Sequence, residues 1–197
     1  MSLVSGWLVA DEQEFDVVLA AAGRGEQWAM AQLFRAYQPM LVRYLRGQVR
    51  DAADDLAGEV WLAVAGSLHD IDGGELGFRR WLFTIARRRV VDHRRRVTRR
   101  RTDPTAGDEL DGPDPKALGV DPAVIVADRL AVQQAIDAVT ADLTADQAEA
   151  VLLRIVAGFD VAETARIMDR SPGSVRVLCH RALRRLAARF PEGVLVE

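Results

Sequence analysis

The stretch from Asp160 to Arg189 constrains the fold most, because its pattern indicates two helices separated by a very short break. Asp160 is a good N-cap for the first helix, and Glu163 is placed to complete a capping box with it. The apolar residues that follow recur at helical spacing and define one face: Val161, Ala162, Ala165 and Met168. Ser171 followed by Pro172 then starts the second helix, since serine caps well and proline is tolerated at the first helical position.

The second helix has an apolar stripe and a basic side. The stripe consists of Val175, Leu178, Cys179, Ala182, Leu183 and Leu186. The positive charges come from Arg176, Arg181, Arg184, Arg185 and Arg189, and no acid lies between Ser171 and Pro191. A short helix, a three-residue turn and a basic second helix form the pattern of a helix-turn-helix, whose second helix enters the major groove of DNA. An ordinary pair of antiparallel helices with a solvated basic face is the alternative interpretation.

A second basic block lies near the middle of the chain. Between Arg79 and Arg101 there are eleven arginines and one acid, Asp92, so the segment carries a net charge of +10. The same segment has an apolar stripe at helical spacing, made of Phe78, Trp81, Leu82, Ile85 and Ala86. Because so many like charges repel one another unless an anion neutralises them, the segment indicates a polyanionic partner rather than a solvated face.

An acidic segment follows and divides the chain. Residues 102–128 hold seven acids against Lys116, a net charge of −6. Residues 102–122 also contain four prolines and three glycines, which is the composition of a linker. We therefore predict a domain over 14–101, a linker over 102–123 and a second domain over 124–190.

Helical periodicity covers the rest of both domains. One helix places Met30, Leu33, Phe34, Tyr37, Leu41, Tyr44 and Leu45 on one face, and Pro39 inside it is expected to kink or open it. Another helix starts near Asp51 and turns inward Leu56, Val60, Trp61 and Val64. Residues 69–77 are rich in glycine and aspartate and predict a loop.

The second domain is expected to hold further helices over 124–139 and 145–157. The core stripe of the latter is Val151, Leu152, Ile155 and Val156, and Gly158 suits a C-terminal cap. Alternating β-branched runs are absent. The predicted fold class is therefore all-α: two small helical domains joined by an acidic Pro/Gly-rich linker, the second ending in a helix-turn-helix.

Composition argues against several other classes of protein. No apolar run approaches the ~20 residues of a membrane helix, and the N-terminus lacks the pattern of a signal peptide, so no membrane insertion and a cytoplasmic location are expected. Three scattered histidines form no metal cluster, and no cofactor is expected. Cys179 lies on an apolar stripe, which favours a buried small hydrophobe over an oxidant sensor. Nothing in the chain resembles a nucleophile-base pair, so catalysis is not predicted.

Four blocks resemble, in order, the extracytoplasmic-function (ECF) group of bacterial RNA polymerase sigma factors. They are LFRAYQPMLVRYL (33–45), DAADDLAGEVWLAV (51–64), FRRWLFTIARRRVVDHRRR (78–96) and the segment 143–186 that ends in the helix-turn-helix. The resemblance extends over residues 14–189. It implies a factor that binds core RNA polymerase, directs it to minus-35 and minus-10 promoter elements and stabilises melted DNA for initiation.

The resemblance also implies site residues. Core polymerase would be bound by the acidic helix through Asp51, Asp54, Asp55 and Glu59. Minus-10 DNA would be bound by the central helix through Arg79, Arg80, Arg87, Arg88, Arg94, Arg95 and Arg96. Minus-35 DNA would be bound through Ser171, Ser174, Arg176, His180 and Arg181. An anti-sigma factor is a further implied partner.

For the minus-10 element, a pocket for an unstacked base is expected between the loop 72–78 and the start of the basic helix. Trp81 fits a core position better than a stacking platform, because it belongs to the apolar stripe. The acidic linker either threads a basic channel of the polymerase, as in the family, or is a solvated tether.

The chain departs from the family pattern at four places. Gly58 replaces a glutamine, and Arg88 replaces an asparagine of the minus-10 pocket, so base preference there does not carry over. Thr144 stands in place of a proline and is expected to serve as an N-cap. In the recognition helix, Val177 and Leu178 replace a polar and a basic residue, which removes one phosphate contact.

Two other classes of protein are compared with this interpretation. A repressor or a response-regulator output domain explains the C-terminal half but leaves the arginine helix and the acidic helix without a role. A nucleic-acid-processing enzyme explains the basic surface but lacks paired carboxylates or metal ligands in one place.

Overall fold

In the computed structural model, the described part of the chain comprises residues 12–68, 71, 73–102 and 134–189. It contains helices and no strand, as the predicted all-α class requires. The elements are, in order, α1 (Glu12–Gly23), α2 (Gln27–Gln48), the short 3-10 helix η1 (Arg50–Ala52), α3 (Ala53–Ser67), α4 (Gly74–Thr102), a helical segment at 134–140, α6 (Ala145–Ile155), α7 (Val161–Met168) and α8 (Pro172–Arg189). The predicted linker lies outside the described residues from 103 onwards, as do residues 124–133 of the helix predicted over 124–139.

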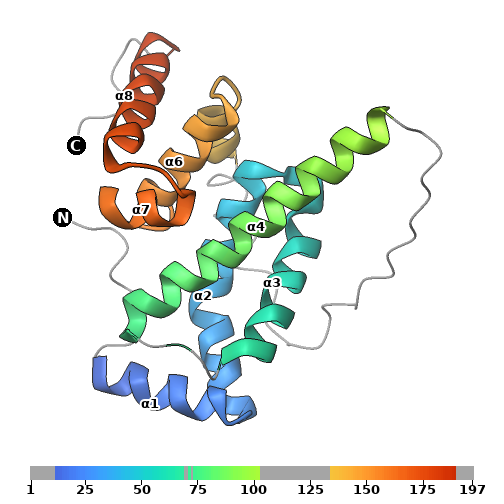
Figure 1. Cartoon of the computed structure of the whole chain (residues 1–197), viewed down its shortest axis with the longest axis vertical. Helices are drawn as coiled ribbons and strands as arrows, with labels where there is room; N and C mark the ends of the chain where they lie inside the picture. The colour runs from blue at the N-terminus through green and yellow to red at the C-terminus, as the bar shows by residue number, and fades with distance from the viewer. Residues whose placement is uncertain (1–11, 69–70, 72, 103–133, 190–197) are drawn as a thin grey trace.

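Helices α1 to α4 pack against one another (Figure 1), and the core between them is rich in aromatic side chains. The rings of Phe15, Tyr37 and Phe78 contact one another, with centroids 5.1–6.5 Å apart. The inward residues predicted for α3 are all buried, and those predicted for α2 are buried or packed against this core, so both stripes are confirmed. Amphipathic helices of this kind gain most of their stability by burying such a stripe against their neighbours.

Two local expectations in this part of the chain need correction. The loop predicted over 69–77 ends earlier, because α4 begins at Gly74 instead of Phe78. Gly73 and Gly74 have φ of 102° and 60°, which only glycine adopts without strain, and the Gly73 carbonyl accepts the Gly77 N–H at 2.9 Å. Pro39 lies exposed inside α2 and the helix continues through it from Gln27 to Gln48, so it does not open the helix there; a kink at Pro39 stays a prediction.

The helix-turn-helix forms as predicted. Asp160 caps α7 by accepting the Glu163 N–H at 2.7 Å, and Asp169 ends that helix in the left-handed conformation at φ 53°. Three residues later α8 begins, and Ser171 Oγ accepts the Ser174 N–H at 3.1 Å. The capping box expected at Glu163 is wrong in its second half, since this carboxylate pairs with Arg166 instead of returning to the cap.

Helix α6 is buried more broadly than an amphipathic stripe predicts. Its cap is the expected one, a reciprocal capping box between Thr144 and Gln147. Every residue from 147 to 153 is buried, because α6 packs against α2 on one side and against α7 and α8 on the other. The predicted core position of Ile155 is wrong: the side chain is 62% exposed at the last residue of the helix.

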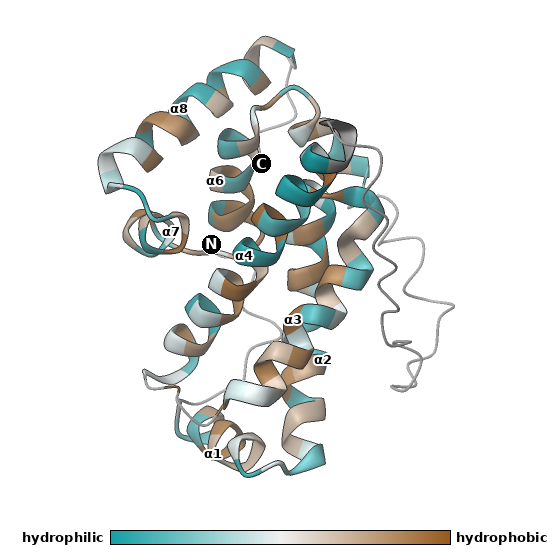
Figure 2. Cartoon of the chain, turned by 45° about the vertical axis from the view of Figure 1, so that its right-hand side comes forward, coloured by the Kyte–Doolittle hydropathy of each residue, from teal (hydrophilic) through white to brown (hydrophobic). Residues whose placement is uncertain are grey.

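The apolar stripe of α8 is also narrower than predicted. Hydrophilic and hydrophobic bands alternate along this helix (Figure 2). Val175 and Ala182 are fully buried, whereas Leu183 is half exposed and does not belong to the core. Cys179 is partly buried against the core, and burial raises the pKa of its thiol, which opposes thiolate chemistry. On α7 the expected core position of Ala162 is wrong too, since this residue is exposed.

Candidate nucleic-acid interface

The arginines of α4 fall into two groups according to what they contact. Arg79, Arg80 and Arg87 reach the C-terminal helices. Arg87 Nε donates to Glu149 Oε1 at 2.7 Å, and Arg80 lies 3.4 Å from Glu163 Oε2. These three side chains are therefore engaged with the C-terminal half of the chain, although the side chain of Arg80 is still 40% exposed.

Arg79 makes two contacts with the segment between α6 and α7. Its guanidinium donates to the carbonyl oxygen of Ala157 and lies over the ring of Phe159, 5.2 Å from the ring centroid. A guanidinium above an aromatic face is attracted by the ring quadrupole, and Arg is the residue that most often makes this contact.

The remaining α4 arginines lie toward its C-terminal end. Arg94 donates to the carbonyl oxygen and the side-chain amide oxygen of Gln48 on α2, and Arg89 lies 3.6 Å from Glu59 on α3. Arg88 and Arg95 are exposed and Arg96 is half-buried. This end of α4 therefore presents the cations that are accessible to an anionic ligand.

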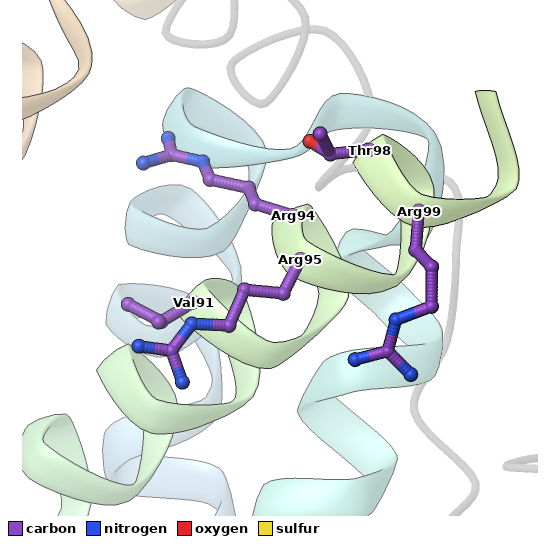
Figure 3. Close-up of a pocket in the computed structure, with 5 residues that line it drawn as sticks. All are labelled: Val91, Arg94, Arg95, Thr98 and Arg99. Atoms are coloured by element: carbon purple, nitrogen blue, oxygen red, sulfur yellow. The ribbon is translucent and has the colours of Figure 1, made fainter. Parts of the chain in front are cut away.

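Part of that surface forms an open depression of about 490 Å³. Its lining residues, shown in Figure 3, are Val91, Arg94, Arg95, Thr98 and Arg99. In that view the side chains of Arg95 and Arg99 leave α4 on a different side from that of Arg94. Arg95 and Arg99 are one helical turn apart, so their charges lie on the same side of α4. A phosphate group is the simplest ligand for two arginines in this arrangement.

The segment 72–78, expected to form one wall of a base pocket, is a loop over a shorter stretch than predicted. Gly74 to Phe78 are helical, and Asp72 lies outside the described residues. Trp81 is partly buried against the core, 6.2 Å from the Phe78 ring, which agrees with a core position better than with a stacking platform.

The acidic residues of the third helix lie at its N-terminal end and are mostly accessible. Asp51 is on η1 and Asp55 on α3, and both are exposed. Asp54 is 64% exposed and pairs with Arg46 at 3.1 Å, and Glu59 is the partner of Arg89. Solvent-exposed pairs of this kind contribute little to stability, so these carboxylates are available to another cation.

The second helix of the helix-turn-helix presents all five predicted side chains to solvent: Ser171, Ser174, Arg176, His180 and Arg181. The hydroxyls of Ser171 and Ser174 are 2.9 Å apart at its N-terminus. By contrast, Arg185 bonds to Gln147 and to the carbonyl of Asp142, and Arg189 pairs with Asp142, so these two arginines hold α8 to the preceding segment.

Residues that the sequence did not identify lie where the two halves of the chain meet. Glu149 is 5% exposed and its carboxylate contacts Arg87 and the hydroxyl of Tyr44, 3.5 Å away. Burial raises the pKa of Glu149 despite the neighbouring Arg87, and burial also raises the pKa of Tyr44. Glu163 is likewise buried beside Arg80. The sequence offered one signal of a buried acid here: Glu149 lies between two alanines, Ala148 and Ala150, in an otherwise apolar helix.

Some features are not found in the described residues. They hold no group of three or more His, Cys, Asp or Glu side chains placed to bind a metal ion. Every helix there is too short or too polar to cross a bilayer.

Comparison with known proteins identifies relatives for both halves. Residues 33–101 match the family model of Sigma-70 region 2, and residues 133–186 match that of Sigma-70 region 4. The chain is 32% identical over 185 residues to the ECF RNA polymerase sigma factor BldN of Streptomyces coelicolor, covering 93% of this chain and 68% of that protein. It is 30% identical over 194 residues to the ECF RNA polymerase sigma factor SigD of Mycobacterium tuberculosis, covering 93% and 87%.

Solved structures show the same fold at lower identity. CnrH in complex with the cytosolic domain of CnrY superposes with a TM-score of 0.62 at 21% identity, covering 92% of this chain and 98% of that one. The sigma factor RpoE in complex with the anti-sigma factor NepR from Bartonella quintana gives a TM-score of 0.55 at 22% identity, covering 90% and 94%.

Proposed function

Because the chain belongs to the ECF family of RNA polymerase sigma factors, we propose that it binds core RNA polymerase and directs it to a two-element promoter. The observation that carries this proposal is the helix-turn-helix, whose second helix exposes the side chains of Arg176, His180 and Arg181 after the exposed serines at its start. In this arrangement α8 binds the minus-35 element and α4 binds the minus-10 element. The domains that do so are 14–101 and 124–190, connected by 102–123.

On α8, the residues nearest the N-terminus are placed for DNA. In a helix-turn-helix, the first turns of the second helix reach the base edges while helix N-termini bind phosphate. Arg176, His180 and Arg181 follow Ser171 and Ser174 along the exposed face. Arg176 and Arg181 are the candidates for base edges or phosphates, since a bidentate arginine-guanine contact is the commonest specific one.

On α4, the exposed arginines support binding to the backbone of melted minus-10 DNA. Exposed Arg88 and Arg95, with half-buried Arg96, supply charge that binds phosphates whatever the sequence, because phosphate contacts position a protein without specifying bases. Which base is captured is set by residues other than these, and Arg88 occupies the place of the family's asparagine.

The acidic surface of η1 and α3 is the proposed contact with core polymerase. Asp51 and Asp55 are exposed. Asp54 and Glu59 form weak surface ion pairs with Arg46 and Arg89, and they exchange these for ion pairs with the polymerase on binding. We further propose that the protein acts in the cytoplasm without catalytic chemistry of its own, and that an anti-sigma factor regulates it by covering these surfaces. One solved protein of the same fold, the sigma factor RpoE, is in complex with such a partner, the anti-sigma factor NepR.

Promoter-specific transcription with purified core polymerase tests the proposal. Core enzyme plus this protein is incubated with genomic fragments, and the transcripts are sequenced to locate their start sites. Starts that share elements near minus-35 and minus-10 are expected. Absence of any promoter-specific transcript contradicts the proposal.

The α8 assignment is tested with a charge-matched pair of variants. Arg181→Ala is expected to reduce promoter binding by polymerase by about tenfold, the range of a lost base or phosphate contact. Arg35→Ala removes one exposed arginine from α2, away from α8, and serves as the control. Equal effects of the two changes contradict a specific role for α8.

A further inference from the structure

Val177 is an exposed apolar residue on the outer side of α8. Helix α8 packs against α6 and α7 at one edge of the molecule (Figure 1). The side chain of Val177 is 47% exposed, although valine is among the residues most often buried. At about 100° per residue, Val177 lies about 200° around the helix axis from Val175, which is fully buried. Val177 therefore points almost directly away from the core.

The residues around Val177 include those predicted to bind minus-35 DNA. Residues three and four positions apart are neighbours on a helix surface. The four neighbours of Val177 by this spacing are all exposed: Gly173, Ser174, His180 and Arg181. Three of them carry hydrogen-bonding side chains, so Val177 is an apolar spot at the centre of a polar surface.

Gly173 allows this part of α8 to come close to a ligand. It lies one helical turn before Val177, on the same side of the helix, and has no side chain. In the described part of the chain, and apart from its neighbours in the helix, the atom nearest to a Cβ built at Gly173 is Ser171 Oγ at 3.9 Å. The space in front of Gly173 is therefore open, and close approach of the backbone to a ligand is one of the uses of glycine.

A valine side chain on such a surface selects its partner by lacking polar atoms. It has no donor or acceptor, so it forms no hydrogen bond to a phosphate or to a base edge, and a polar group facing it loses water without gaining a partner. In the major groove, the C5-methyl group of thymine is the apolar group that the bases present. Cytosine has a hydrogen at that carbon and an amino donor beside it. A valine that enters the major groove therefore favours a T·A pair.

We propose that Val177 is a specificity-determining residue that contacts the C5-methyl group of a thymine in the minus-35 element. This inference rests on the proposed function, because it requires α8 to lie in the major groove of that element. Arg181 is the neighbour of Val177 one turn further along α8, so the thymine is expected at or beside the base pair that Arg181 contacts. The apolar residue that removes a phosphate contact from the family pattern thus supplies a base contact instead.

Selection from a promoter library with a randomised minus-35 segment locates the thymine. Core RNA polymerase is combined with the wild type, with Val177→Ala or with Leu183→Ala, and the bound promoters are sequenced. Leu183 is the matched control, because it is an apolar residue of the same helix with similar exposure, 50%, about 120° around the axis from Val177. Alanine favours the helix, so both variants are expected to fold. Val177→Ala alone is expected to lose the preference for one thymine.

Deoxyuridine at that position tests the methyl group itself, since it pairs as thymine does but lacks the C5-methyl. The wild-type holoenzyme is expected to bind the deoxyuridine promoter about fourfold more weakly, which is the effect of one buried methyl group. Leu183→Ala is expected to show the same loss, and Val177→Ala is expected to bind both promoters equally. Methylating C5 of a cytosine at that position is expected to strengthen binding by the wild type but not by Val177→Ala.

The outcomes separate this inference from the proposed function. Equal binding of the thymine and deoxyuridine promoters by the wild type overturns the methyl contact, and so does an undiminished difference in Val177→Ala. If Arg181→Ala changes the selected minus-35 sequence and Val177→Ala does not, the role of Val177 is overturned while the proposed function stands. If the wild-type holoenzyme selects no minus-35 sequence at all, both are overturned.

Discussion

Replacing Phe159 by alanine should uncouple the two domains, because its ring touches the N-terminal domain in two ways. The ring is 2% exposed, meets Phe83 at 5.4 Å and lies under the guanidinium of Arg79 at 5.2 Å. An aromatic pair contributes about 1 kcal/mol beyond its burial, and a cation–π contact about another 1 kcal/mol. Loss of about 2 kcal/mol lowers the ratio of joined to separated domains roughly 30-fold.

Urea denaturation followed by two probes measures this uncoupling. All four tryptophans, Trp7, Trp28, Trp61 and Trp81, precede residue 102, so their fluorescence reports the N-terminal domain alone. Circular dichroism reports the helices of both domains. In the wild type we expect coincident transitions, as for one cooperative unit. In Phe159→Ala we expect two separated transitions, with the C-terminal helices unfolding first because a Phe to Ala change in a core costs about 3–5 kcal/mol.

A second variant separates uncoupling from simple destabilisation. Thr144→Ala removes the cap of α6 and costs about 1 kcal/mol, but it leaves the contacts of Phe159 in place. Its two transitions are expected to shift together. The reasoning is refuted if Phe159→Ala keeps coincident transitions, or if Thr144→Ala separates them to the same extent.

Three further predictions concern single residues. Gly158→Ala should destabilise the C-terminal domain by about 1–2 kcal/mol in thermal melts, because φ is +69° there, and an unchanged melting temperature would contradict this. Burial raises the pKa of Glu149 only while the two domains are in contact, so protonation of Glu149 favours that contact. The contact is more stable below the usual pKa of a glutamate and loses that part of its stability as pH rises through the raised value. Glu149→Gln should remove this pH dependence from the radius of gyration measured by small-angle X-ray scattering, and a dependence that survives the change would assign it to another group. Because burial raises the thiol pKa of Cys179, iodoacetamide at pH 7.5 should alkylate the folded protein more slowly than the urea-unfolded chain, and equal rates would count against this.

Features that depend on neighbouring residues were predictable. The caps at Thr144, Asp160 and Ser171 each use a side chain and a backbone N–H three residues apart, so the chain must form them wherever the helix forms. The inward stripes of α2 and α3 follow in the same way from a helical period and one buried side. The predicted return bond from the Glu163 side chain to Asp160 does not form, because Arg166 pairs with the Glu163 carboxylate.

Core positions in the C-terminal domain were harder to predict. The stripe that included Ile155 assumed that α6 is buried on one side, but α2 covers it as well, so Leu153 is buried and Ile155 at the helix end is not. The predicted core position of Leu183 was wrong for the opposite reason: among the described residues α8 packs mainly against α6 and α7, and this side chain is half exposed. Periodicity places residues around a helix, whereas the number of neighbours decides how many of them are buried.

The sequence by itself determined the helices, their caps, the helix-turn-helix and a strongly basic central helix, because each depends on local spacing and on charge. Only the tertiary structure decided which arginines of that helix are accessible. Arg87 and Arg88 are adjacent and carry the same charge, yet Arg87 is paired with Glu149, 62 residues away, and Arg88 is exposed. Contacts between residues so distant in the chain depend on how two folded domains pack, and no local pattern encodes that packing.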